Sequence, residues 1–137
     1  MTQVIGFWPN TSRLLIHYLG DRTGLPVYSL RPAEGWQAVA PCIFVDRLPG
    51  PPSDGFSKTY TFDVEVMHTD LDALDGIVQF VEVYMFTLPS EKDTTAHVDD
   101  VQCTAEFAGV PADELDLERA VATFDITVRP QPASTTP

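Results

Sequence analysis

Strict alternation of apolar and polar residues in two distant segments constrains the fold of this 137-residue chain most strongly. Residues 60–66 read YTFDVEV, and residues 120–128 read AVATFDITV. Successive side chains of a β-strand point to opposite faces of a sheet, so each segment should place one row in a core and the other in water. Residues 101–107 alternate similarly, with the predicted core row Val101, Cys103, Ala105 and Phe107. The three segments predict antiparallel strands that share one covered face.

Four further segments complete the predicted fold. Residues 42–48, CIFVDRL, are apolar enough for a strand covered on both faces, and residues 27–30 form a short strand candidate. Residues 12–23 carry a helical apolar stripe between candidate caps at Asn10, Thr11 and Ser12 and the terminators Gly24 and Pro26. Together with a helix over residues 71–87, these segments predict an α+β fold in the order α-β-β-β-α-β-β. Two helices should pack on one face of a mostly antiparallel sheet of four to five strands.

The helix predicted over residues 71–87 has one regular apolar face and an acidic start. The face consists of Leu71, Leu74, Val78, Val81, Met85 and Leu88. Asp70, Asp72 and Asp75 lie where free amide groups and the helix dipole stabilise carboxylates. A metal site would recruit His68 with Asp70 and Asp72, but the glycine and closing glutamate of a calcium loop are absent. Capping therefore explains the three acids without a ligand.

The same helix is apolar on its other sides as well. Ile77, Phe80, Val83, Tyr84 and Phe86 lie off the regular face, and few polar residues follow Gly76. A helix that is apolar nearly all round must be covered nearly all round. We expect Phe80, Val83, Tyr84 and Phe86 to contact another subunit. The alternative is that the first helix and the segment around Trp36 cover them within one molecule.

Length and composition favour one domain over residues 1–129 and a flexible tail over residues 130–137. No apolar run is long enough for a membrane span, and the first residues lack a secretory signal, so we expect an intracellular protein. Cys42 and Cys103 are isolated in apolar surroundings. Buried free thiols are expected, with a disulfide as the alternative.

The net charge of −12 is concentrated in residues 70–125, which hold fourteen acids against two bases. Such a field repels phosphates and argues against ordinary binding to DNA or RNA. Three interpretations of this acidity stay open. It can serve only solubility, it can let DNA pass without adhering, or it can imitate DNA to occupy a basic partner.

The sequence indicates no enzyme. His17, His68 and His97 are scattered, and no nucleophile elbow, zinc-protease motif, phosphate loop or dinucleotide fingerprint is present. Asp63 and Glu65 are expected on the wet face of their strand, outside any dry pocket that could tune them for acid chemistry. We predict no catalytic residue, cofactor or metal.

Three stretches carry a resemblance to a known family. They are "PCIFVDRLPGPPSDGFSKTYTFDVEVM", "DALDGIVQFVEVYMFTLP" and "RAVATFDITVRP". In pattern they resemble the tail terminator proteins of long-tailed bacteriophages, over about residues 14–129. The chain departs from that pattern in the loop "PGPPSDG" and in Phe124, where a tyrosine is frequent.

The resemblance implies a structural virion protein of the tail or neck, assembled in the host cytoplasm. Such proteins form a ring, usually hexameric, that caps the tail tube, stops its polymerisation and offers a surface to the head connector, while DNA passes through. The matching loop would contact the tube or connector through Arg47, Pro49, Gly50, Pro51, Pro52, Ser53 and Asp54. If the wet sheet face turns inward, Asp63, Glu65, Glu106 and Asp125 would line the channel. The alternatives are another head-tail joining or tail completion protein, or an acidic DNA mimic that inhibits a host nucleic-acid enzyme.

Overall fold

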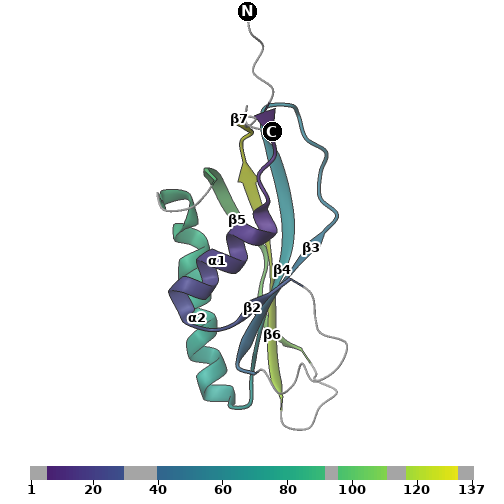
Figure 1. Cartoon of the computed structure of the whole chain (residues 1–137). Coiled ribbons are helices and arrows are strands. Elements are labelled where there is room, and N and C mark those ends of the chain that lie inside the picture. The colour runs from purple at the N-terminus through teal and green to yellow at the C-terminus, as the bar shows by residue number, and fades with distance from the viewer. Residues whose placement is uncertain (1–5, 30–39, 92–95, 111–116, 133–137) are drawn as a thin grey trace, which may run out of the picture.

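A computed structural model of the chain describes residues 6–29, 40–91, 96–110 and 117–132. Figure 1 shows two helices on one side of a long, twisted sheet. In chain order the elements are β1 (Gly6–Phe7), α1 (Thr11–Thr23), β2 (Val27–Tyr28), β3 (Cys42–Leu48), β4 (Lys58–His68), α2 (Leu71–Thr87), the 3-10 turn η2 (Leu88–Ser90), β5 (Val98–Val110), β6 (Glu118–Val128) and β7 (Gln131–Pro132).

Five strands form the main sheet in the order β2-β3-β4-β6-β5. β2 runs parallel to β3, and the other neighbouring strands are antiparallel. The central strands β4 and β6 pair without interruption from Lys58 opposite Val128 to His68 opposite Glu118. The mostly antiparallel sheet and the order α-β-β-β-α-β-β predicted from the sequence are confirmed.

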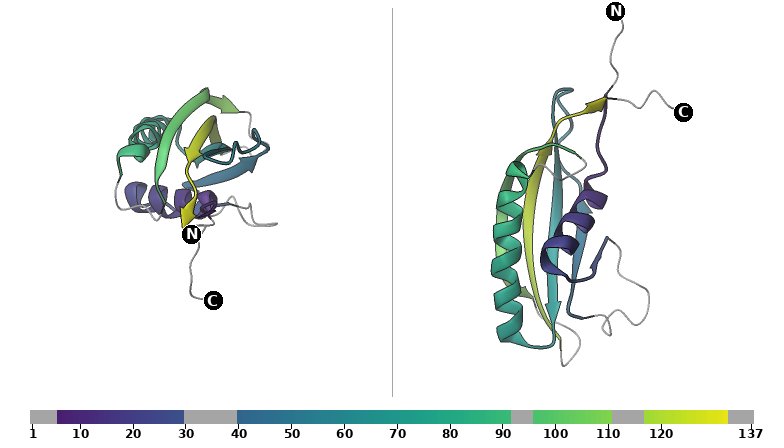
Figure 2. Two further views of the ribbon diagram at one scale, coloured as in Figure 1. Left: turned by 90° about the horizontal axis from the view of Figure 1, so that it is seen from above. Right: turned by 60° about the vertical axis from the view of Figure 1, so that its left-hand side comes forward.

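Both helices cover the same face of the sheet, as Figure 2 shows from two further directions. Leu15 and Leu19 of α1 and Val81 and Met85 of α2 lie in one buried cluster with the inward row of β4 and β6. The Tyr18 hydroxyl of α1 donates a 2.8 Å hydrogen bond to the backbone carbonyl of Tyr84 in α2. This contact ties the two helices to each other as well as to the sheet.

The first helix begins and ends at residues that the sequence marks for those roles. The Asn10 side chain accepts a 3.0 Å hydrogen bond from the Arg13 N–H and so caps the start. Gly24 ends the helix at φ 71°, a left-handed conformation that glycine adopts without a Cβ clash.

The second helix has its predicted bounds, but its acidic start works differently from the expectation. Asp70 occupies the N-cap position, yet among the described residues no helix N–H donates to its carboxylate. The Asp70 N–H itself donates to His68 Nδ1 at 2.9 Å. Leu71, predicted on the buried face, is exposed, whereas Leu74 three residues later is buried. Capping by the Asp70 side chain was therefore a wrong prediction, and Asp72 is the acid in the first turn.

The outer face of the sheet is not wet along its whole length, contrary to the prediction. Cys42 and Phe44 of β3 form a second buried cluster there with Met67 and Leu117. Glu65 is also buried on this face, where Arg119 donates to its carboxylate. β3 is covered on both faces only from Cys42 to Val45, and its following residues Asp46 and Arg47 are exposed.

Strand β5 breaks the alternation that its sequence suggests. Its register against β6 shifts between Cys103 and Ala105 and again between Ala105 and Ala108. Ala105 therefore lies opposite Thr123 of the outer row and is exposed, so its predicted place in the core was wrong. A bulge inserts a residue that no partner opposes, which reverses the facing of the residues that follow.

The chain ends and the cysteines complete the fold. β1 and β7 pair antiparallel, which holds residues 131 and 132 of the predicted tail against the segment before α1, while residues 133–137 lie outside the described part. Both thiols are free as predicted, with Cys42 buried and Cys103 only half-buried. Within the described residues no helix is long and apolar enough to cross a membrane.

Candidate assembly surfaces

The outward side of α2 is an apolar surface in the isolated molecule. Phe80 is 63% exposed, Val83 is 56% exposed and Phe86 is 47% exposed. Tyr84 is half-buried, and its ring stacks on that of Phe80 with centroids 6.2 Å apart. The first helix does not reach these side chains, and residues 30–39, which include Trp36, lie outside the described part. Of the two alternatives read from the sequence, coverage by α1 therefore fails for Phe80, Val83 and Phe86.

A hollow of about 250 Å³ lies beside this surface, between the end of α1 and the middle of α2. Leu25, Ile77, Phe80 and Tyr84 supply its apolar walls. At its rim Arg22 is ion-paired with Glu91 at 2.6 Å and lies over the Tyr18 ring. The hydrogen bond that the Arg22 guanidinium donates to the Tyr18 side chain and the charge of Glu91 raise the pKa of Arg22, so the rim stays cationic.

The connection between β3 and β4 forms a structured projection at the far side of the molecule (Figure 1). Asp54 Oδ1 accepts hydrogen bonds from the N–H groups of Phe56 at 2.8 Å and Ser57 at 2.7 Å. These two hydrogen bonds, first that from Ser57 and then that from Phe56, are the largest causes that lower the pKa of the Asp54 carboxyl. Gly55 adopts φ 87° within this turn. The turn presents the Phe56 side chain to solvent, with 84% of it exposed.

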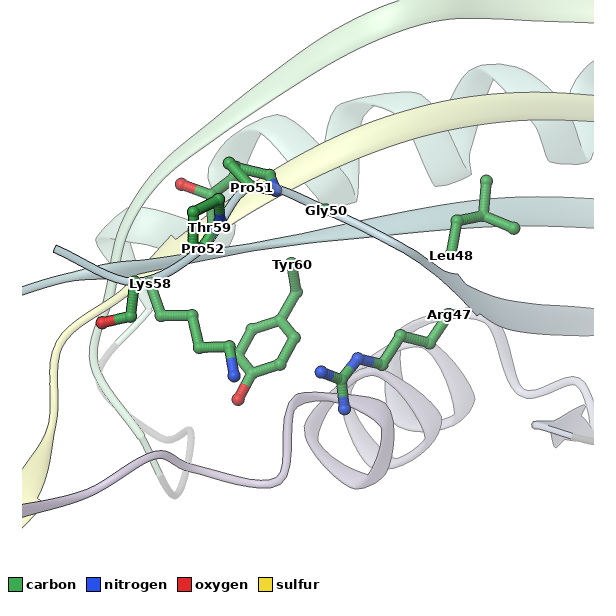
Figure 3. A pocket seen from close by; sticks show the side chains of 9 residues that line it. Arg47, Leu48, Gly50, Pro51, Pro52, Lys58, Thr59 and Tyr60 are labelled. Carbon is green, nitrogen blue, oxygen red and sulfur yellow. The ribbon is translucent and has the colours of Figure 1, made fainter.

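Two cations and a tyrosine lie at the base of this connection (Figure 3). The Arg47 guanidinium is 4.5 Å from the centre of the Tyr60 ring, and the Lys58 ammonium is 5.0 Å from it. They border a hollow of about 230 Å³ whose other walls include Gly50, Pro51 and Pro52. A Cβ on Gly50 would lie 3.1 Å from the Thr59 carbonyl oxygen, a tight contact that a larger residue could make only if the loop or β4 moved by a few tenths of an ångström. Figure 3 shows Arg47 and Lys58 reaching toward Tyr60 from two directions.

These cations differ from three other arginines of the described residues. Arg22, Arg119 and Arg129 each form an ion pair with a carboxylate. Within residues 6–29, 40–91, 96–110 and 117–132, Arg47 and Lys58 contact the Tyr60 ring and no carboxylate. A cation on an aromatic ring keeps its charge available to a partner.

The outer face of the sheet brings together three of the four acids considered for a channel lining. Asp63 lies directly opposite Asp46, accepts a 2.6 Å hydrogen bond from Thr123, and borders a hollow of about 360 Å³. Asp125 accepts a 2.8 Å hydrogen bond from Thr61 on the same face. Glu65 is there too, but Arg119 neutralises it.

Glu106 lies apart from that group, within the register shift of the edge strand β5 between Ala105 and Ala108. It is exposed, and with Glu82 it helps to raise the pKa of the half-buried Cys103 thiol, although burial is the main cause. The pairing of the strands thus connects Asp63, Asp125 and Glu65 but not Glu106.

Nothing in the described residues forms a recognisable reaction centre. No group of three or more histidine, cysteine, aspartate or glutamate side chains there could hold a metal ion. Sequence reasoning missed Phe56, Lys58 and Tyr60 as a group with Arg47. The available signal was an aromatic residue placed directly after a glycine in an otherwise polar loop.

Comparison with known proteins finds structural similarity but no sequence match. No protein-family model matches the sequence, and no curated protein sequence matches it. The fold is similar to that of a chain in a solved structure described as "Virion of native gene transfer agent (GTA) particle". The TM-score is 0.52 at 14% identity, and the match covers 81% of this chain and 84% of that chain. At this identity the likeness establishes a shared α+β fold.

Proposed function

We propose that this chain is a tail terminator, a structural protein of a phage-like virion. It forms a ring, usually of six copies in such proteins, that caps the tail tube, stops its polymerisation and joins the tail to the head connector. The observation that carries the proposal is the exposed apolar side of α2. The likeness to a virion chain supports the setting, and the sequence pattern supports the specific role.

The exposed side of α2 calls for a protein partner on energetic grounds. Full burial of a side chain such as phenylalanine or valine stabilises by about 1.5–3 kcal/mol. Phe80, Val83 and Phe86 are each about half exposed or more, and they lie along one helix. Closed assembly of identical copies buries such a surface on every copy at once.

In this proposal the projecting loop contacts other virion proteins and the acidic residues line the channel. Arg47, Pro49, Gly50, Pro51, Pro52, Ser53 and Asp54 contact the tube or the connector. Asp63, Glu65, Glu106 and Asp125 line the channel, where negative charge keeps DNA from adhering. Glu65 contributes least to that field because Arg119 balances its charge.

Light scattering on the purified chain, alone and with its tube protein, tests the proposal. A terminator forms an oligomer, at least on the tube end, and shortens tubes that polymerise in its presence. The matched control is Val83→Asp, which is expected to lose both effects. A strict monomer that leaves tube length unchanged contradicts the function.

Two other roles fit parts of the same chain. Another head-tail joining protein would share the fold and the ring, and it would bind the connector without limiting tube length. The acidic outer face, with Asp63 opposite Asp46, also fits a DNA mimic. A mimic is expected to be monomeric or dimeric and to inhibit a DNA-binding enzyme, so the same tube assay separates it from a terminator.

A further inference from the structure

Two surfaces on opposite sides of the molecule have complementary chemistry. The β3–β4 connection offers an exposed phenylalanine, Phe56, two residues before Lys58, and Lys58 and Arg47 both lie against the Tyr60 ring. The side of α2 offers an apolar surface and hollow around Phe80, preceded by exposed carboxylates at the start of the helix. Figure 1 shows the connection at the upper right and α2 at the left, so one molecule cannot bring the two together.

The distance from Phe56 to Lys58 can be matched to the distance from Phe80 to Asp72. Lys58 follows Phe56 by two residues, a separation of at most about 7 Å along an extended chain. Asp72 precedes Phe80 by eight residues, which is about 12 Å along a helix axis. The flexible four-carbon stem of lysine can span the remaining difference. An aromatic side chain seated at Phe80 thus allows its neighbouring cation to reach Asp72.

We infer that the β3–β4 connection of one copy docks on α2 of the next copy, with Phe56 in the hollow beside Phe80 and Lys58 against Asp72. This inference rests on the proposed ring and names the surface that covers α2. The contact is head-to-tail, because each copy inserts its β3–β4 connection into one neighbour and presents its α2 to the other. Contacts of this kind can close into rings. Residues 49–54 remain for the tube or connector, and only Arg47 changes its assigned partner, since it lies beside Lys58.

The structure also explains why a second copy is a suitable occupant. In a chain with net charge −12, random approach of two copies is repulsive, so an attractive contact needs a local group of cations. Arg47 and Lys58 supply that group within the described residues, and the hydrogen-bonded turn at Asp54 holds Phe56 in place before contact. A rigid exposed aromatic anchor loses little conformational freedom on docking.

Sedimentation velocity of single variants and their mixture tests this contact. Phe56→Asp and Phe80→Asp should each raise the dissociation constant of self-association roughly 30-fold or more, as expected for anchor residues. The Phe56→Asp variant keeps an intact α2 surface, and the Phe80→Asp variant keeps an intact β3–β4 connection. A 1:1 mixture should therefore form heterodimers and no larger species. Thermal melting should show both variants folded, because both side chains are exposed.

Charge reversal provides a second readout. Lys58→Glu should weaken association several-fold at low salt, and adding Asp72→Lys in the same chain should restore it. Arg13→Glu, an exposed cation on α1, is the matched control and should leave association unchanged. Rising salt should weaken the wild type more than the Lys58→Glu variant.

Three outcomes overturn the contact. They are a wild type that is monomeric at every concentration, a Phe56→Asp variant that associates normally, and a mixture that forms no heterodimer. In the second case, tubes shortened by the wild type would leave the terminator function standing with α2 covered in another way. If the two variants form the heterodimer but the wild type does not shorten tubes, the terminator function is contradicted and the contact between copies stands.

Discussion

Asp54 is the residue that shapes the tip of the β3–β4 connection. Its carboxylate accepts hydrogen bonds from two consecutive backbone N–H groups, and only the ionised form accepts them well. The same residue, read in sequence, is one of the twenty acids of the chain, with nothing that marks it for this role. Its role depends on the turn at Gly55, which folds the chain back over the carboxylate.

The Asp54 turn should loosen in acid. Because folding lowers the pKa of Asp54 below its ordinary value of 3.8, the stabilisation is fully present above pH 3.8 and is lost as pH falls through the lowered pKa. Nuclear magnetic resonance should show the Phe56 and Ser57 amide signals moving with a midpoint below pH 3.8. The Asp54→Ala variant serves as the control and should show neither movement. A midpoint above pH 3.8 in the wild type contradicts the prediction.

The Glu65–Arg119 pair should matter more for folding than an exposed pair. Glu65 is buried, so Arg119→Ala removes a cation from a buried ion pair and should lower the free energy of unfolding by about 2–4 kcal/mol. Arg22→Ala, which breaks the more exposed pair with Glu91, should cost about 1 kcal/mol or less. Urea denaturation of both variants checks this, and equal losses would contradict the difference in burial.

At the scale of elements, α2 has one side in the core and one apolar side in solvent. One side of the helix supplies buried Leu74, Val81 and Met85, and the opposite side supplies exposed Phe80 and Val83. Neighbouring positions of the same residue type therefore have different roles. Val81 and Val83 are two residues apart on opposite sides, which gives an internal comparison.

The two valines should respond differently to the same substitution. Val81→Asp places a charge in the core and should unfold the protein. Val83→Asp lies on the exposed side, so its melting temperature should stay close to that of the wild type while self-association is lost. Circular dichroism and light scattering measure the two properties. Loss of the folded monomer in Val83→Asp would show that this side chain belongs to the core.

Two glycines should also respond in opposite directions. A Cβ on Gly76 meets nothing within 4 Å, and Gly76 lies inside α2, so Gly76→Ala should raise the free energy of unfolding by about 0.5–1 kcal/mol. Gly24→Ala should lower it, because Gly24 has φ 71°. Chemical denaturation of both variants provides the test, and a destabilised Gly76→Ala would contradict the helix propensity argument.

At the scale of the whole molecule, charge is distributed unevenly over the fold. The acids Asp63 and Asp125 lie on the outer face of the sheet, while the cations Arg47 and Lys58 without carboxylate partners lie at the base of one connection. The net charge of −12 dominates at distances beyond these local groups. We therefore expect a passing polyanion to be repelled, while a protein surface with local carboxylates could still approach Arg47 and Lys58.

The purified chain should not retain double-stranded DNA. Affinity for DNA comes largely from releasing counterions around phosphates, which requires clustered cations on the approaching surface. Fluorescence anisotropy with a labelled duplex at low salt should show no binding. Asp63→Lys with Asp125→Lys should bind weakly and lose that binding as salt rises. Salt-sensitive binding by the wild type would contradict a repulsive surface.

The sequence alone determined the five strands of the main sheet, the two helices and their order, but not the pairing of β1 with β7. The period of two in residues 60–66 and 120–128 and the helical spacing from Leu74 to Met85 are local patterns, and local backbone geometry converts them directly into elements. Asn10 and Gly24 set helix ends for the same reason. The apolar sides of α2 were also visible in the sequence, as was the overall excess of acid.

Only the tertiary structure decided which residues share a surface. The bulges that turn Ala105 outward depend on strand pairing, and the burial of Glu65 depends on a cluster built by Cys42, Phe44, Met67 and Leu117. The grouping of Arg47, Lys58 and Tyr60 depends on two strands meeting at one edge. Burial and charge pairing are properties of what packs against a side chain, and those neighbours come from distant parts of the chain.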